Sequence, residues 1–248
     1  MIRTAKVVYG TSYTLPTDLG YTINSCTDGN GKTYTTASVV ITDKNTVLTI
    51  KELTYNEYNI GDIGPAGGYI VFDADATDDS TMHGYSEYSS ETLGWRYLEC
   101  SKEDLEATYI FGYYRPTGTN TTLIAEADGK KIGKGKTNTA SLIEAMGETA
   151  YDAETSENKA EYAAFAAASY DEGGYSDWFL PSSEELSKLA TIVNLNIGDV
   201  SKNTKYWSST EFGNDGLKAD CSDFDSHYIG GFGVVRSEKH LVRPFRSF

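Results

Sequence analysis

The sequence predicts an α+β protein in which a small β-rich module precedes a larger mixed domain. Strand patterns lie at both ends of the chain and helix patterns in its middle, which favours this class. The 248 residues include 21 Lys+Arg and 36 Asp+Glu, for a net charge of −15. Residues 1–57 hold five basic and five acidic side chains, so all of the excess lies in residues 58–248. This change in charge along the sequence predicts a domain boundary near Glu57, with the linker at Asn56–Asp62.

The first module reads as short strands rich in Val, Thr, Ile and Tyr, separated by turn signals. Asp28-Gly29 and Asn30-Gly31 suit the positive backbone φ angles of a tight hairpin. The predicted strands are Lys6–Tyr9, Thr33–Thr36, Val39–Thr42 and Thr46–Lys51.

The second domain begins with strands and continues with helices. Asn138–Met146 is predicted as a helix capped by Asn138 or Thr139, and the alanine-rich segment Glu157–Tyr170 as a second helix. The strands expected before these helices are Gly67–Asp73 and Trp95–Cys100.

Ser182 and Glu185 fit a capping box that opens a third helix, which runs to about Val193. From Lys205 onward the pattern returns to strands and glycine, in the strings KYWSST, HYIGGFGVV and LVRPFRSF.

Composition excludes several classes of protein. A chain this acidic lacks the clustered Lys and Arg on which nucleic-acid binding depends. No apolar run approaches the roughly 20 residues of a membrane span, so no membrane insertion is expected. The amino terminus lacks the apolar core of a signal peptide, so either the chain begins inside a longer sequence or it uses another route.

Three cysteines, Cys26, Cys100 and Cys221, are too few and too far apart for a disulfide framework or a zinc site. They are expected to be half-buried thiols, and a Cys100–Cys221 disulfide stays open as the alternative.

Two segments resemble ligand-binding loops but depart from the templates. Gly129–Thr137 (GKKIGKGKT) would be a phosphate-binding loop only if the first glycine stood one position later, so we expect a basic loop entering a helix. Asp73–Asp79 has four carboxylates in seven residues but fails the EF-hand pattern. A solvated acidic loop is the favoured interpretation, with Ca²⁺ binding left open.

No catalytic motif is present, and neither a metal nor a cofactor is predicted. The nucleophile elbow Gly-x-Ser-x-Gly does not occur, and the three histidines have no partners at metal or triad spacing. The protein is therefore not expected to be an enzyme. The three tryptophans are expected in the core, with carbohydrate stacking as the alternative.

Six motifs in residues 61–248 resemble the bacterial family typified by the C-terminal domain of the Legionella collagen-like adhesin. This resemblance implies a C-type-lectin-like fold, related to the formylglycine-generating-enzyme type but without its copper-binding cysteine pair. The motifs are GDIGPAGGYIVFD, GWRYLEC, IGKGKTNTA, GGYSDWFLPSSEEL, YWSSTE and VRPFRSF.

The first module, over about Lys6–Ile50, resembles the Listeria–Bacteroides repeat, a B-repeat type of module found along bacterial surface proteins. It lacks the repeat's usual first strand and has Cys26 where the family has Trp. The resemblance implies a spacer with a β-grasp-like fold.

YWSSTE, a degenerate stretch and VRPFRSF together resemble variable proteins of diversity-generating retroelements. In these, a C-terminal segment of a lectin-like domain is rewritten at adenine-containing codons between fixed strands. An ordinary glycine-rich loop and strand pair is the alternative. The resemblance implies scaffold roles for Trp207, Arg243, Pro244 and Phe245, and a ligand face over residues 212–240. The candidate ligand-binding residues are Phe212, Asn214, Asp215, Asp223, Phe224, Asp225, His227, Tyr228, Phe232, Arg236, Lys239 and His240.

These observations predict a ligand-recognition protein, either a retroelement variable protein or a surface adhesin, that binds a protein or glycan on another cell or surface. It would act outside the cell or at the cell surface, or in a phage particle. The alternative is a structural subunit of a phage tail tip or cell surface. Residues 211–248 have a net charge of only −1, so the ligand need not be cationic.

Overall fold

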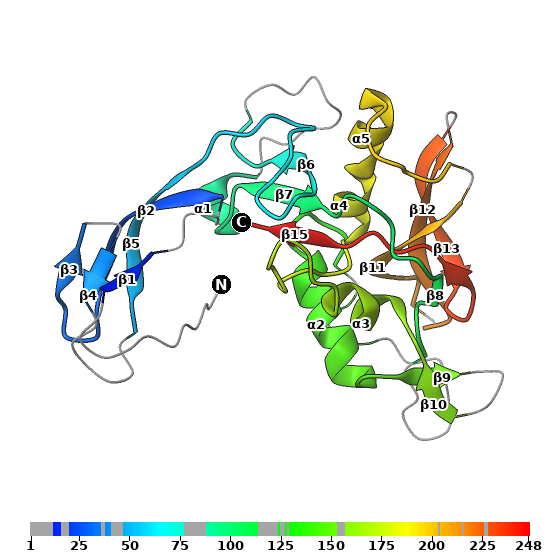
Figure 1. Cartoon of the computed structure of the whole chain (residues 1–248). Coiled ribbons are helices and arrows are strands. Elements are labelled where there is room, and N and C mark those ends of the chain that lie inside the picture. Colours follow the sequence, from blue (N-terminus) through cyan, green and yellow to red (C-terminus); the bar gives the residue numbers. More distant parts are fainter. Residues whose placement is uncertain are drawn as a thin grey trace. The chain divides into compact units, whose positions relative to one another are not determined.

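A computed structural model describes residues 12–15, 20–35, 38–40, 47–76, 88–113, 124, 127, 129–152, 157–202, 204–214, 216–225 and 228–248. The chain divides into two compact units, Met1–Tyr58 with Phe248, and Asn59–Ser247. The division lies one residue beyond the expected position at Glu57. The protein is β-rich, since small sheets dominate it and its longest described helix has 12 residues (Figure 1).

The described residues of the first unit form two small antiparallel sheets. One has the strand order β3-β2-β5 and the other pairs β1 with β4. Their bounds are β1 Ser12–Thr14, β2 Tyr21–Thr27, β3 Thr33–Tyr34, β4 Ser38–Val40 and β5 Thr49–Tyr55.

The predicted hairpin turn of the first unit is present between β2 and β3. The Asp28 carboxylate accepts the backbone N–H groups of Asn30 and Lys32, each at 2.9 Å, and Gly31 has a φ of +83°. Three of the four predicted strands correspond to β3, β4 and β5, while Lys6–Tyr9 lies outside the described residues.

The second unit combines sheets of two or three strands with short helices. The strand orders are β15-β7-β6, β11-β12-β13, β14-β8 and β10-β9. The strands are β6 Tyr69–Asp73, β7 Tyr97–Cys100, β8 Tyr109–Ile110, β9 Ala150–Asp152, β10 Glu157–Ala160, β11 Tyr206–Phe212, β12 Lys218–Asp225, β13 Tyr228–Val235, β14 Lys239–His240 and β15 Phe245–Ser247. The helices are α1 Ser90–Leu93, α2 Gly135–Met146, α3 Ala163–Ala168, α4 Ser183–Ser187 and α5 Leu189–Leu195.

The predicted capping box is confirmed at the start of α4. Ser182 Oγ accepts the N–H of Glu185 at 3.3 Å, and the Glu185 carboxylate accepts the N–H of Ser182 at 2.7 Å. The predicted third helix is present as α4 and α5, which meet at Lys188.

Two helix predictions need correction. Glu157–Ala160 is a strand paired with β9, and only Ala163–Ala168 of that segment is helical, because strand pairing overrides a high helix propensity. The helix predicted at Asn138 begins at Gly135, with Lys134 at the N-cap position. Asn138 is no cap, since its Nδ2 donates to the Gly129 carbonyl at 2.7 Å.

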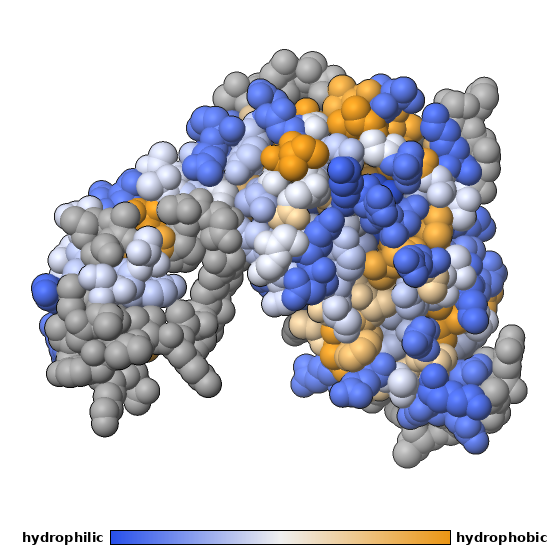
Figure 2. All heavy atoms as spheres, viewed as in Figure 1, coloured by the Kyte–Doolittle hydropathy of each residue, from blue (hydrophilic) through white to orange (hydrophobic). Residues whose placement is uncertain are grey.

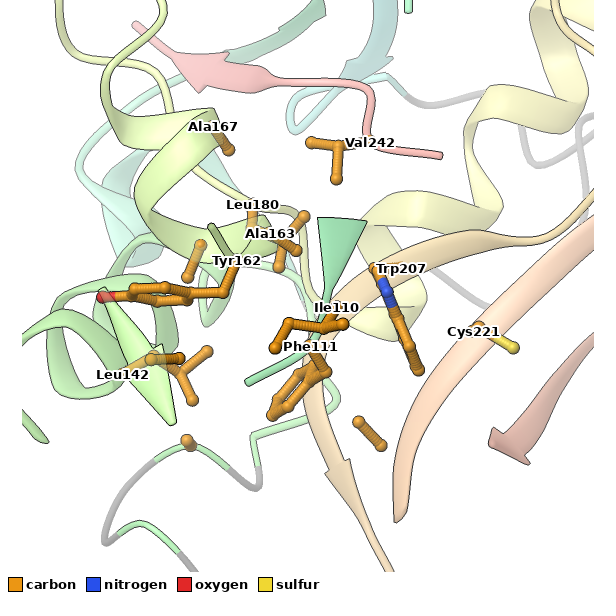
Figure 3. Close-up of a cluster of buried hydrophobic side chains, with 14 of the residues drawn as sticks. Ile110, Phe111, Leu142, Tyr162, Ala163, Ala167, Leu180, Trp207, Cys221 and Val242 are labelled. Atoms are coloured by element: carbon orange, nitrogen blue, oxygen red, sulfur yellow. The ribbon is translucent and has the colours of Figure 1, made fainter. Parts of the chain in front are cut away.

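Three clusters of buried hydrophobic side chains lie among the described residues of the second unit, and the two largest form most of its core. In the first, Leu142 of α2, Ala163 of α3 and Trp207 of β11 converge with Ile110 and Phe111 (Figure 3). The second gathers side chains of β6, β7, α4 and α5 around Phe245. Trp207 and Trp178 are 0% and 3% exposed, which confirms the core prediction for both, whereas Trp95 is half-buried against Phe72.

All three cysteines are fully buried and not half-buried as expected, and they are unpaired, so the Cys100–Cys221 disulfide is not formed. At the surface, hydrophobic residues lie over α5, where Leu195 is 49% exposed (Figure 2). No helix in the described part of the chain is long and apolar enough to cross a membrane.

The C-terminal segment is held by buried ion pairs. Arg246 Nη1 lies 2.9 Å from Glu99 of β7, and both side chains are fully buried. Arg246 Nε also bonds Asp177 at 3.1 Å, and its guanidinium stacks 3.9 Å from the Tyr175 ring centroid. Arg243 Nε bonds Asp104 at 2.6 Å. Two arginines near the C-terminus therefore join the C-terminal segment to two segments that lie far away in the sequence, residues 99–104 and Asp177.

Replacing Arg246 by Met should lower the free energy of unfolding by about 3–5 kcal/mol, because Glu99 would remain buried without its partner. Chemical denaturation measures this. The control is Lys159→Met, which removes an exposed pair with Glu157 (52% and 68% exposed) and should cost at most about 1 kcal/mol. Equal losses in the two variants would contradict an anchoring role for Arg246.

Candidate functional site

The segment predicted to bind a ligand is built mainly from the antiparallel sheet β11-β12-β13. The register of β12 and β13 runs without interruption from Lys218↔Val235 to Asp225↔Tyr228. The β11 and β12 strands have an irregularity between Trp207 and Glu211. The sheet is framed by buried residues, since Trp207, Arg243 and Phe245 are all 0% exposed and Pro244 is also buried.

Six of the predicted ligand-binding residues are at least partly accessible. Asn214 and Lys239 are exposed, while Phe212, Asp223, Phe232 and His240 are half-buried. They do not form one cluster, because strand alternation puts Phe212 and Asp223 on opposite faces of the sheet.

Two predicted ligand residues are buried and have structural roles. Phe224 is 1% exposed and packs edge-on against Tyr206, with ring centroids 5.5 Å apart. Arg236 is 0% exposed, and its guanidinium bonds the buried Glu211 carboxylate. Neither side chain is open to a ligand.

Four further candidates are only partly covered by the structure. Asp215 and His227 lie outside the described residues, and Asp225 and Tyr228 are described only as backbone positions in β12 and β13.

His240 is a weak candidate for a proton-transfer or metal-binding group. Its ring packs 4.8 Å from that of Trp207, and burial lowers its pKa despite the nearby Glu238. Nε2 lies 3.4 Å from a Glu238 oxygen, which is too long for a strong ion pair. No group of three or more His, Cys, Asp or Glu among the described residues could hold a metal ion.

One face of the sheet, which we call the glycine face, carries Phe212, Asp220, Gly231, Gly233 and Val235. Phe212 reaches across to Gly233, where a Cβ atom would overlap its ring. The Asp220 carboxylate reaches in the same way over Gly231, where a Cβ would lie 2.5 Å from Oδ1. Only glycine at these two positions lets both side chains lie flat across β13.

Asp220 is an unusual group on this face. The residue is 5% exposed, and its Oδ1 has no hydrogen-bond partner among the described residues. Burial raises the pKa of Asp220 from its ordinary 3.8 to about 6, although Lys130, the Ser183 side chain and the Cys221 N–H act in the opposite direction. A buried carboxylate oxygen without a partner is costly for stability, and such groups gather at functional sites.

The surroundings of Asp220 offer further recognition groups. Gly231 beside it is exposed, Val235 is 40% exposed, and Lys130 Nζ lies 5.7 Å from the Phe212 ring centroid. Sequence reasoning identified Phe212 but missed Asp220 and Lys130. The signal that could have found this face is the GGFG string, because glycines inside a strand mark the close approach of another group.

The two loop motifs are engaged internally. Gly133 and Gly135 donate their N–H groups to the Glu185 carboxylate at 2.8 and 3.1 Å, so these amides are not available to a phosphate. Burial raises the pKa of Glu185 to about 7, although the amides of Ser182, Gly133 and Gly135 stabilise its charged form.

In the acidic loop, Asp73 accepts two bonds from Arg96, at 2.9 and 3.1 Å, and Asp75 accepts the Ser90 N–H at 2.7 Å. These two carboxylates are thus used within the fold. Asp78 and Asp79 lie outside the described residues.

Asp220→Asn should change the pH dependence of stability. The raised pKa means that the folded protein holds a proton more tightly than the unfolded chain. The contribution of Asp220 is therefore fully present below about pH 4 and is lost as the pH rises through about 6. At pH 7 the variant should be more stable by up to about 3 kcal/mol. Urea unfolding of the wild type and the variant between pH 4 and 7 tests this, and equal pH dependence in the two proteins would contradict it.

Gly233→Ala should destabilise the protein by about 1–3 kcal/mol, because the new methyl group must displace the Phe212 ring. In a Phe212→Ala background the same substitution should cost much less, and thermal unfolding of the four proteins gives the coupling. Gly29→Ala, at a position with no atom within 4 Å, is the control for adding a methyl group. If Gly233→Ala lowered the stability by the same amount in the Phe212→Ala background, the contact between Phe212 and Gly233 would be contradicted.

No protein-family model and no curated protein matches the chain. Among solved structures, it is similar to the crystal structure of a fimbrial protein from Bacteroides ovatus ATCC 8483, with a TM-score of 0.43 and 13% sequence identity. The similarity covers 92% of this chain and 49% of the fimbrial protein, so the chain spans about half of that protein's length.

Proposed function

We propose that this protein is a ligand-recognition protein of the surface-adhesin kind, and that its second unit is a C-type-lectin-like domain displaying residues 212–240. The proposal rests on a difference in burial between the residues that flank this segment and the candidate residues within it. Trp207 on one side and residues 242–246 on the other are buried, while most described candidates between them are accessible.

The side chains of this segment suit recognition. Phe212 supplies a rigid aromatic surface, Asn214 and Lys239 supply exposed polar groups, and Leu217 is 43% exposed beside them in the sequence. Aromatic anchors mixed with adaptable polar groups are typical of binding surfaces. The buried Arg236–Glu211 pair fixes β11 relative to the end of β13, so substitutions in the loops of this segment need not disturb the sheet.

The finer proposal is that residues 212–240 are diversified by a retroelement, as the resemblance implies. A test at the DNA level is direct. The coding segment should differ from a nearby non-coding copy only at adenines, and differences at other bases would reject diversification while leaving ligand recognition in place.

Replacing Phe212, Asn214, Asp223 and Lys239 together by Ala should abolish ligand binding and change the free energy of unfolding by no more than about 2 kcal/mol, because all four are exposed or half-buried. Binding would be measured on glycan and protein arrays with the full chain. The control replaces Lys136, Glu144, Glu148 and Lys159, four exposed residues outside this segment. Normal binding by the folded first variant would place the site elsewhere, and an array without any binder would favour the assembly-subunit alternative.

A further inference from the structure

Strand β13 is an edge whose backbone faces outward. It lies last in the order β11-β12-β13, and no other described strand pairs with it. Arg236 N–H donates to the Leu217 carbonyl at 3.2 Å, so Leu217 and Arg236 are a hydrogen-bonded pair at the end of the β12–β13 ladder. Bonded and non-bonded pairs alternate in an antiparallel ladder, so the N–H groups of Gly231, Gly233 and Val235 point away from β12.

This edge has none of the usual protection against strand addition. Natural edges are shielded by charged residues, proline, bulges or short length. The β13 sequence YIGGFGVV spans eight residues, contains no charge and no proline, and pairs with β12 without a bulge. Gly231 and Val235 are exposed and Gly233 is half-buried, so the backbone of this edge is accessible at these residues, although the Val235 carbonyl accepts the Glu238 N–H at 3.0 Å.

A chemical preference is built in next to the open amides. Asp220 Oδ1 lies over Gly231 and has no partner among the described residues, although the side chain is well buried. A residue of an added strand that lies opposite Gly231 would have its Cβ atom about 5 Å from Gly231, on the same face of the sheet. Its side chain would then be within reach of Asp220 Oδ1. Such an acceptor favours a hydrogen-bond donor, and a cationic one most strongly.

We propose that β13 binds an extended peptide segment of a partner protein as an additional strand, with a donor side chain opposite Gly231 meeting Asp220. This inference rests on the proposed function and names its ligand class. A peptide fits better than a saccharide because only an extended backbone repeats its donors and acceptors at the spacing of alternate β13 residues.

The test selects peptides from a random display library on the full chain and resynthesises the enriched ones with single N-methyl groups. Methylation at alternate residues, those whose amides face β13, should weaken binding about tenfold or more. Methylation at the intervening residues should have little effect. The enriched sequences should share Lys, Arg, Ser, Thr or Asn at one position.

Asp220→Asn then tests the proposed contact between Asp220 and a donor side chain of the peptide, since it keeps the shape of the Asp220 side chain and removes its charge. Binding of the selected peptides should weaken about tenfold, because a charge-assisted hydrogen bond becomes a neutral one. The control is Glu144→Gln, at an exposed residue of α2 outside this sheet, which should leave binding unchanged.

The inference would be overturned if no peptide were enriched, or if N-methylation left the affinity of the enriched peptides unchanged at both sets of alternate residues. If glycans bind on the array and no peptide is enriched, recognition stands and the peptide class falls. If neither binds, the proposed function falls as well. Equal weakening by the Asp220→Asn and Glu144→Gln variants would remove the role assigned to Asp220.

Discussion

The pairing of buried arginines with buried or half-buried carboxylates holds the second unit together. Arg246 joins Glu99 and Asp177, Arg243 joins Asp104, and Arg236 joins Glu211. Glu99 and Glu211 also accept hydrogen bonds from backbone N–H groups. Glu99 accepts the N–H groups of Ala66 and Gly68 at 3.0 and 2.9 Å. Such pairs contribute less to net stability than to fixing one arrangement, because desolvation offsets much of the attraction.

This rigid frame explains how the β12–β13 hairpin can carry features that cost stability. An unpaired carboxylate oxygen, exposed apolar side chains and an open strand edge are each unfavourable in isolation. The glycines of β13 bring all three to one surface, because side chains from β11 and β12 can lie across it. A face that combines such features is better explained by binding than by folding.

Much of the local structure could be predicted from the sequence, because it depends on neighbouring residues. The capping box at Ser182, the Asp28 turn and most strands are of this kind. The predictions fail where contacts with residues distant in the sequence determine the local structure. The Glu157 segment is a strand because β9 pairs with it, and α2 begins early at Gly135, where the distant Glu185 carboxylate accepts the amide at the helix start. Phe224 and Arg236 looked like ligand residues because their type suits recognition, but burial depends on packing that no spacing reveals.

The position of the arginine partners has a consequence for biosynthesis. Glu99, Asp104 and Asp177 emerge from the ribosome well before Arg243 and Arg246. Until these two arginines have been synthesised, Glu99 cannot be buried without a large penalty. The second unit therefore completes its fold only after β15 has been made, and contacts of such long sequence separation make that step slow. A chain truncated before Arg243 would leave the three carboxylates without these partners, so the folded state itself reports that β15 is present.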